Sequence, residues 1–420
     1  MKHRIVLLSM LALGIVWILL LRVEAQSALA PADRESAWRE DLDFFSREFP
    51  LRHKDFGALY PRAQWDAAIE ALSRSIATTS DADIVLGLMR LVATAHVGHT
   101  YVRLPMTGPF AFHRLPIAVQ WFADGLAITA ATEPYRDALG LRITRIGKLA
   151  PELLQASVAP FIASEYDGWL RLQSQTFMVT EEVLGAVGQL DADGRVPVSV
   201  ARVDGSIETL RLAPVPWAAA PFITVQAALN LPVGPASVEP NRAYRYELWP
   251  DKKTVYVRYN KCQDDPRQPF AAFVQELFGK VDAKPRSFDR AIIDLRANGG
   301  GNSEIIKPLL KELRARPALG GRGHLFALIG PGTFSSAVLA ALDLRDMKAM
   351  LVGEAPGEQL RSYGEVRPLT LPRSGILVQY STRYFKLGKA GPMNPNVRVA
   401  PTIADLIAGR DPVLERAIAR

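Results

Sequence analysis

A buried strand runs directly into a glycine turn at residues 291–301, where the sequence reads AIIDLRANGGG. The apolar residues 291–293 predict the strand, and three successive glycines allow the backbone to approach a ligand closely. After the turn, apolar residues recur at helical spacing: Ile305, Ile306, Leu309, Leu310 and Leu313. A strand, a turn and an amphipathic helix in this order are typical of α/β layering.

A second unit of the same kind follows along the chain. Residues 325–329 are apolar and predict a strand, 330–333 read GPGT, and Ser335 stands where the next helix begins. Another apolar strand is expected at 349–352. Strands and helices alternate from Tyr244 onward, so the fold class is predicted to be α/β in this part and α+β overall, with some parallel pairing.

The junction at Ser335 suits a nucleophile. A hydroxyl reacts when a base takes its proton and fixed donors stabilise the developing oxyanion. The start of a helix offers unpaired N–H groups and the positive end of the helix dipole, and Ser336 supplies one such N–H. Helix capping by Ser335 or Ser336 is the alternative interpretation. The glycine turn lacks the dinucleotide and P-loop fingerprints, so nucleotide binding is disfavoured.

Three motifs together resemble the C-terminal processing (tail-specific) serine proteases and the related tricorn proteases: DLRANGGG at 294–301, GTFSSA at 332–337 and LVGE at 351–354. Gly98-His99-Thr100 extends the resemblance, as does a weaker Pro395-Asn396 pair. The resemblance implies a ClpP/crotonase-like protease core. It also implies that Ser335 is the nucleophile.

The oxyanion site of this family pairs a glycine N–H with the N–H that follows the nucleophile. The resemblance therefore implies Gly299 or Gly300 as one donor and Ser336 as the other. The general base is expected to differ from the lysine of the Ser/Lys members, because the corresponding positions hold Gln359, Leu360 and Arg361. Arginine stays protonated and cannot replace that lysine.

Tricorn-like members of the family instead use the histidine of a Ser/Gly-His-Thr motif, which His99 matches. The chain therefore looks closer to the tricorn-like branch, with His99 as the base for Ser335 and His96 as a weaker candidate. Glu365 is a candidate to orient the base, with a solvated loop residue as the alternative. Cys262 is expected to be a buried small hydrophobe, and no His/Asp/Glu grouping has the spacing of a metal site, so no metal or other cofactor is expected.

The 420 residues are enough for two to three domains. Residues 105–214 alternate short β-rich runs with turns and look like a degenerate PDZ module, which would hold extended peptides by strand addition; a purely structural β domain is the alternative. The predicted division is a signal peptide or membrane anchor at 1–25, a helical region at 31–104, a PDZ-like domain at 105–214, a linker at 215–241 and a serine peptidase core at 242–420.

The N-terminus predicts export. Lys2, His3 and Arg4 precede an apolar run at 5–21, as in a signal peptide, with an uncleaved anchor as the alternative. The product is expected in the periplasm or outside the cell. The net charge of +7 is scattered, so nucleic-acid binding is not indicated, while attraction to an anionic membrane or envelope is compatible with it.

These features predict an exported serine-type peptidase that hydrolyses polypeptides through a Ser335 acyl-enzyme. The alternative is an inactive protease-like scaffold that binds peptides or lipophilic ligands. The interphotoreceptor retinoid-binding protein resembles these proteases and binds lipophilic ligands, so the scaffold is compatible with either role.

Overall fold

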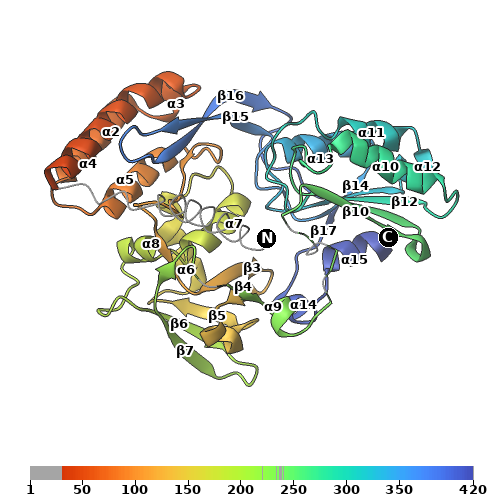
Figure 1. Ribbon diagram of the computed structural model, residues 1–420, viewed down its shortest axis with the longest axis horizontal. Coiled ribbons are helices and arrows are strands. Elements are labelled where there is room, and N and C mark those ends of the chain that lie inside the picture. Colours follow the sequence, from red (N-terminus) through yellow and green to blue (C-terminus); the bar gives the residue numbers. More distant parts are fainter. Residues whose placement is uncertain (1–30, 220, 233, 236–238, 240, 420) are drawn as a thin grey trace, which may run out of the picture.

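Three structural regions surround one central junction in the computed structural model (Figure 1). The structure describes residues 31–219, 221–232, 234–235, 239 and 241–419. The predicted signal peptide or anchor at 1–25 lies outside these residues. Within the described part, every helix is too short or too polar to span a bilayer.

The first region is a group of helices: α2 (Pro31–Arg52), α3 (Phe56–Leu59), α4 (Arg62–Ser75) and α5 (Asp81–Ala93). Helix α5 begins at the capping box expected from the sequence, with the Asp83 N–H donating to Ser80 Oγ at 3.1 Å. Phe49 stacks on Trp65 in the core of this group, with ring centroids 5.4 Å apart. After α5 the chain passes through His99 into the short strand β1 (Tyr101–Val102).

The second region is an antiparallel sheet with strand order β3-β4-β5-β6-β7, and β9 pairs with β4. Its side chains alternate between buried and partly exposed positions along β6, as expected for a sheet with one covered face. The strands are β3 (Ile117–Phe122), β4 (Gly125–Ala131), β5 (Arg142–Ile146), β6 (Val196–Ala201), β7 (Ile207–Leu212) and β9 (Ile223–Thr224). The PDZ-like identity of this region stays a prediction.

Helices and a short ladder complete the second region. The helices are α6 (Pro151–Val158), α7 (Asp167–Phe177) and α8 (Glu181–Ala186), with the 3-10 turns η1 (Glu133–Ala138) and η2 (Ala159–Phe161). Strand β2 (His113–Arg114) pairs with β8 (Val215–Pro216), and α9 (Val225–Ala228) follows β9. The expected linker therefore contains short paired elements where the structure describes it.

The third region is a mostly parallel sheet with order β10-β11-β12-β13-β14-β17, in which only β10 runs antiparallel to its neighbour. Its strands are β10 (Tyr244–Trp249), β11 (Thr254–Tyr259), β12 (Arg290–Asp294), β13 (Leu325–Ile329), β14 (Met350–Gly353) and β17 (Val397–Arg398). Strands β11, β12 and β13 are buried along their whole length, as parallel strands covered on both faces are.

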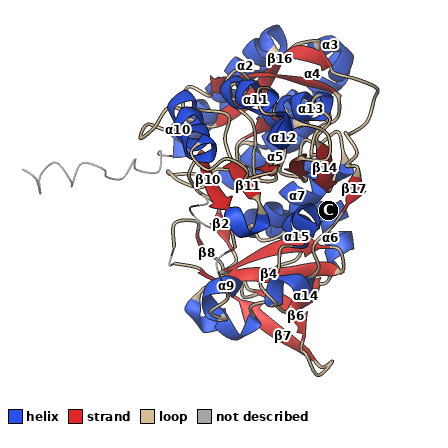
Figure 2. Ribbon diagram, turned by 90° about the vertical axis from the view of Figure 1, so that its right-hand side faces the viewer, coloured by secondary structure: helices blue, strands red, loops and turns tan. Residues whose placement is uncertain are grey.

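Helices cover both faces of this sheet (Figures 1 and 2). One face packs against α10 (Phe270–Asp282), α11 (Lys307–Arg314) and α13 (Ser336–Asp346), and the short α12 (Pro317–Gly320) lies nearby. The other face packs against α15 (Pro412–Ala419). The mixed α/β fold class predicted from the sequence is confirmed.

A long hairpin links the third region to the first. Its strands β15 (Arg361–Thr370) and β16 (Leu377–Lys386) extend over the N-terminal helices, and β16 pairs with β1 (Figure 1). Buried Asp41 of α2 accepts the backbone N–H groups of Arg373 (2.7 Å) and Ser374 (2.8 Å) at the tip of the hairpin. A segment within the expected core domain thus completes the packing of the N-terminal helices.

The C-terminal segment makes a second connection, to the middle sheet. Helix α14 (Ile403–Ile407) places Ile403 against Phe122 and Ala127, and the Ile403 N–H donates to Asp124 Oδ1 at 2.9 Å. The chain then returns to the third region as α15. These connections hold the three regions around the junction where β13 meets α13.

Candidate active site

Ser335 lies at the turn between β13 and α13. The Thr333 hydroxyl pins this turn by donating to the Leu295 carbonyl (2.9 Å) and accepting the Gly330 N–H (3.1 Å). Ser335 has φ 56° and ψ −129°, a conformation that normally favours glycine. It is the N-cap residue of α13, but its side chain makes no capping hydrogen bond. Its hydroxyl is therefore not used in the way that helix capping would require.

Ser336 differs from Ser335 in both its backbone and its side chain. Its hydroxyl donates to the Gly301 carbonyl at 2.5 Å and so ties the helix to the glycine turn. Its backbone N–H is the first of α13, where N–H groups have no partner within the helix. Ser336 can thus supply an N–H to an oxyanion beside Ser335.

The glycine turn lies against Ser335. A side chain at Gly300, where φ is 101°, would place its Cβ 2.6 Å from Ser335 Cβ and 3.0 Å from Ser336 N. This close approach explains why glycine is needed at position 300. The Gly300 N–H, however, already donates to Asn298 Oδ1 at 2.9 Å, whereas Gly299 is exposed at the turn. Gly300 therefore allows the close approach of the turn to Ser335, and its N–H forms a hydrogen bond with Asn298.

Cys262 supports the same turn from behind. Its N–H donates to the Gly300 carbonyl (3.0 Å), and its carbonyl accepts the Asn302 N–H (2.7 Å). Burial raises the pKa of its thiol, which does not favour the reactive thiolate. The buried-hydrophobe interpretation of Cys262 agrees with this environment.

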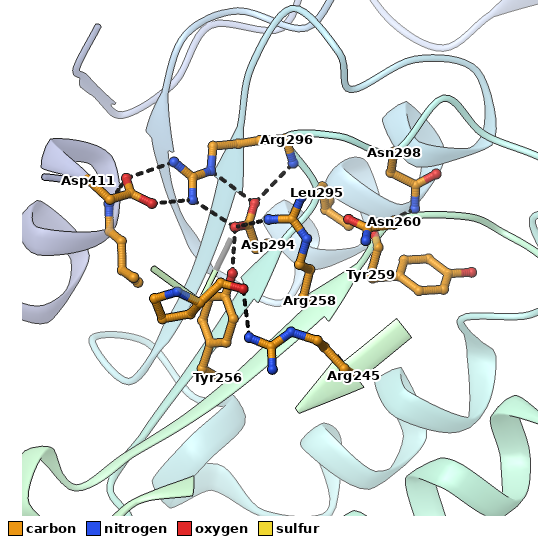
Figure 3. Close-up of polar contacts among 12 residues, drawn as sticks. Arg245, Tyr256, Arg258, Tyr259, Asn260, Asp294, Leu295, Arg296, Asn298 and Asp411 are labelled. Carbon is orange, nitrogen blue, oxygen red and sulfur yellow. Dashed lines mark hydrogen bonds and ion pairs between the residues drawn. The ribbon is translucent and has the colours of Figure 1, made fainter. Parts of the chain in front are cut away.

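Ion pairs anchor the strand that leads into the turn (Figure 3). Arg296 contacts both Asp294, at the end of β12, and Asp411, before α15, at 2.7 Å in each case. Burial alone would raise the pKa of Asp294, but the positive charges of Arg296 and Arg258 and the hydrogen bonds of Arg296 and Tyr256 lower it to about 2. The network keeps the carboxyl end of β12 in a fixed position relative to the C-terminal helix.

His99 and Ser335 meet at one carboxylate, that of Glu358. Glu358 Oε2 accepts the Ser335 N–H at 2.6 Å, and Oε1 lies 3.7 Å from His99 Nδ1. Oε1 also accepts the Ser362 hydroxyl at 2.5 Å. His99 and Glu358 are each only 4% exposed. The fold thus brings a histidine from the N-terminal region to a buried carboxyl and a serine from the third region.

Glu358 is the functional candidate that the sequence analysis missed. It directly precedes Gln359, Leu360 and Arg361, which occupy the region of the lysine in the Ser/Lys members, and nothing in the local sequence marks it as buried. Glu365, the residue proposed to orient the base, lies in β15 with its side chain 46% exposed and 3.8 Å from Arg367. His96 is exposed directly after the turn that ends α5, with φ 52°.

Burial controls the protonation of both groups. It lowers the pKa of His99 to about 4, although the nearby Tyr363 carbonyl acts in the opposite direction. Burial raises the pKa of Glu358 to about 7, against the hydrogen bonds from Ser362 and Ser335. The imidazole is therefore neutral at neutral pH, as a general base must be, and Glu358 ionises near pH 7.

An aromatic wall borders the site. Phe334 lies 4.4 Å from the His99 ring and stacks on Trp169 at 3.9 Å, both between ring centroids. Gly98 and Trp169 also line a cavity of about 810 Å³, together with Tyr101, Phe161 and Phe177. The side chains that line the cavity are mostly apolar, and Gly98, the residue before His99 in the sequence, forms part of its wall.

A separate cluster on the middle region contains His113, Glu181 and Glu182. His113 Nδ1 lies 3.1 Å from Glu182 Oε1 and 3.5 Å from Glu181 Oε2. Both Glu182 oxygens also accept the His113 N–H. The sequence spacing did not indicate this grouping, because His113 in β2 and the two glutamates of α8 are at least 68 residues apart in the chain. The hydrogen bonds between His113 and Glu182 account for the grouping.

No family model matches the chain, and no curated protein matches it. Among solved structures, mature CPAF complexed with lactacystin aligns with a TM-score of 0.60 at 13% identity, covering 91% of this chain and 98% of CPAF. The two proteins therefore share a fold over nearly their whole lengths.

Two structures from the families named above align more weakly. The photosystem II D1 C-terminal processing protease has a TM-score of 0.40 at 13% identity, covering 90% of this chain and 96% of its own. The tricorn protease has a TM-score of 0.46 at 12% identity, covering 93% of this chain and 37% of its own. The closer resemblance to the tricorn-like branch stays a prediction.

Proposed function

We propose that this chain is an exported serine-type peptidase that hydrolyses peptide bonds through a Ser335 acyl-enzyme. The observation that carries the proposal is the meeting of an uncapped serine in a strained turn with buried His99 and Glu358. The fold likeness to mature CPAF, which was solved in complex with lactacystin, supports a ligand-binding site on this scaffold. Export rests on the N-terminal sequence pattern, with an uncleaved anchor as the alternative.

The first half-reaction forms an ester. Ser335 Oγ attacks the carbonyl carbon of the peptide bond while His99 takes the hydroxyl proton. The carbonyl oxygen becomes an oxyanion, stabilised by the Ser336 N–H and an N–H of the glycine turn, Gly299 or Gly300. His99 then donates its proton to the leaving amine as the C–N bond breaks.

The second half-reaction repeats these steps with water. His99 takes a proton from water, the oxygen attacks the Ser335 ester, and the proton returns to Ser335 as the acid leaves. Ionised Glu358 stabilises the imidazolium in each step. Because the pKa of Glu358 is about 7 and that of His99 about 4, activity should rise as the pH increases through about 7.

Labelling with a fluorophosphonate probe, together with casein hydrolysis, tests the proposal. The wild-type chain should label at Ser335 and hydrolyse casein, and Ser335→Ala should abolish both. Ser336→Ala is the matched neighbour: it removes the bond to Gly301 but keeps the backbone N–H, so labelling at Ser335 should persist. Absence of wild-type labelling and hydrolysis would instead support the inactive scaffold, with the cavity lined by Gly98 and Trp169 as its binding site.

A further inference from the structure

Glu165 contacts two residues next to the candidate site: the residue before His99 and the residue after Glu358. It lies in the loop between η2 and α7 of the middle region. Its Oε2 accepts the backbone N–H of Gly98, the residue before His99, at 2.5 Å. Its own carbonyl accepts the side-chain amide of Gln359, the residue after Glu358, also at 2.5 Å.

The contact with Gly98 is tightly enclosed. A Cβ at Gly98 would lie 3.3 Å from Glu165 Oε2 and 3.2 Å from Cζ of Phe334. Phe334 in turn packs against the His99 ring. The Gly98–His99 backbone is therefore held between the Glu165 carboxyl and the aromatic wall, and a displacement of Glu165 would displace the imidazole.

The other carboxyl oxygen of Glu165 is buried and accepts no hydrogen bond from any described residue. Burial raises the pKa of Glu165 to about 7, and the negative charge of Glu358 acts in the same direction, whereas the Gly98 N–H opposes both. Glu358 is therefore the titratable group whose charge bears on this carboxyl. Gln359 and Trp169 add uncharged neighbours.

We infer that Glu165 is a positioning residue for His99, which fixes the Gly98–His99 backbone through the Gly98 N–H and, when ionised, adds a negative charge on the side of the site that also holds Glu358. This inference rests on the proposed function and extends it to the control of the base. A positive charge develops on His99 when it takes the Ser335 proton, so a nearby carboxylate favours that step. The same carboxylate disfavours ionisation of Glu358, because like charges repel.

Two substitutions distinguish the effect of the hydrogen bond that Glu165 accepts from the effect of its negative charge. Glu165→Gln keeps an oxygen that accepts the Gly98 N–H but removes the charge. It should lower kcat by roughly 3- to 30-fold, change KM by less than about 2-fold, and shift the acid limb of kcat/KM to lower pH by about half a unit to one unit. Glu165→Ala also removes the acceptor and should lower kcat further. Asp167→Asn, an exposed neutralisation at the start of α7, is the matched control and should change none of these.

Nuclear magnetic resonance of the His99 ring gives a readout that needs no catalysis. In the wild type, the ring shifts should respond to carboxyl ionisation near pH 7 in more than one step, and Glu165→Gln should remove one step. Unchanged His99 titration in Glu165→Gln would overturn the inference, whether or not the chain is active. The inference would also be overturned if the Glu165 variants lost activity only in proportion to their loss of folded protein, with the acid limb of kcat/KM unshifted. Failure of wild-type Ser335 labelling would count against the proposed function alone.

Discussion

The strained backbone at Ser335 allows the effect of this residue on stability to be measured separately from the effect of its hydroxyl on activity. Because φ 56° and ψ −129° suit glycine, we expect Ser335→Gly to be more stable than Ser335→Ala by roughly 1 kcal/mol. Both variants lack the hydroxyl and should be equally inactive. Thermal or urea unfolding of the pair measures the difference, and equal stabilities would show that the turn relaxes without strain.

Ionisation of Glu358 is expected to favour activity but to lower the stability of the fold. Its pKa is raised in the folded state from 4.5 to about 7, so its favourable contribution is present below about pH 4.5 and is lost as the pH rises through about 7. Glu358→Gln should therefore stabilise the fold at pH 8 by roughly 1 to 3 kcal/mol relative to wild type and much less at pH 4.5.

The same substitution should lower kcat at pH 8 by about 10² to 10⁴, because the imidazolium of His99 loses its carboxylate. Glu365→Gln is the control, since Glu365 is exposed beside Arg367, and it should leave both stability and turnover near wild type. A Glu365→Gln variant that loses activity while Glu358→Gln keeps it would reverse the assignment.

At the scale of elements, the ion pairs at the end of β12 should carry much of the rigidity of the glycine turn. Arg296→Ala leaves Asp294, only 1% exposed in its side chain, without its main partner. Breaking such a buried pair costs about 3 to 5 kcal/mol. Asp411→Asn is the milder control, because Arg296 keeps both bonds to Asp294. Urea unfolding should rank the two variants in that order, and equal losses would contradict this account.

The two strand–turn–helix units could be predicted because all of their signals are local. The apolar runs at 291–293 and 325–329 became β12 and β13, and the glycines became the turn that lies against Ser335. The capping box at Ser80 likewise marked the start of α5. Glu358 could not be predicted in this way, because its burial depends on contacts with Ser335 and His99, which are distant from it in the sequence.

At the scale of the whole molecule, the β15–β16 hairpin joins the regions that supply His99 and Ser335. Its tip is held by buried Asp41, so Asp41→Ala should destabilise the fold by about 1 to 3 kcal/mol, since two backbone N–H groups lose their acceptor. Turnover should fall with it, because the hairpin also carries Ser362.

Glu40→Gln provides the control for Asp41→Ala. Glu40 contacts the same Arg373 through an exposed pair at 3.3 Å, and such pairs contribute less than about 1 kcal/mol. Thermal unfolding and casein hydrolysis should separate the two variants. If Glu40→Gln were as damaging as Asp41→Ala, the backbone contacts at the hairpin tip would not explain the effect.

The order in which the chain can acquire activity follows from the pairing of β1 with β16. Tyr101 lies opposite Gln379, so β1 and β16 can pair only after the chain has been synthesised beyond Gln379. Contacts of such long sequence separation form late, because loop closure must precede them. The site should therefore remain incomplete until synthesis has passed Gln379, and a newly made chain could not cleave anything before that point.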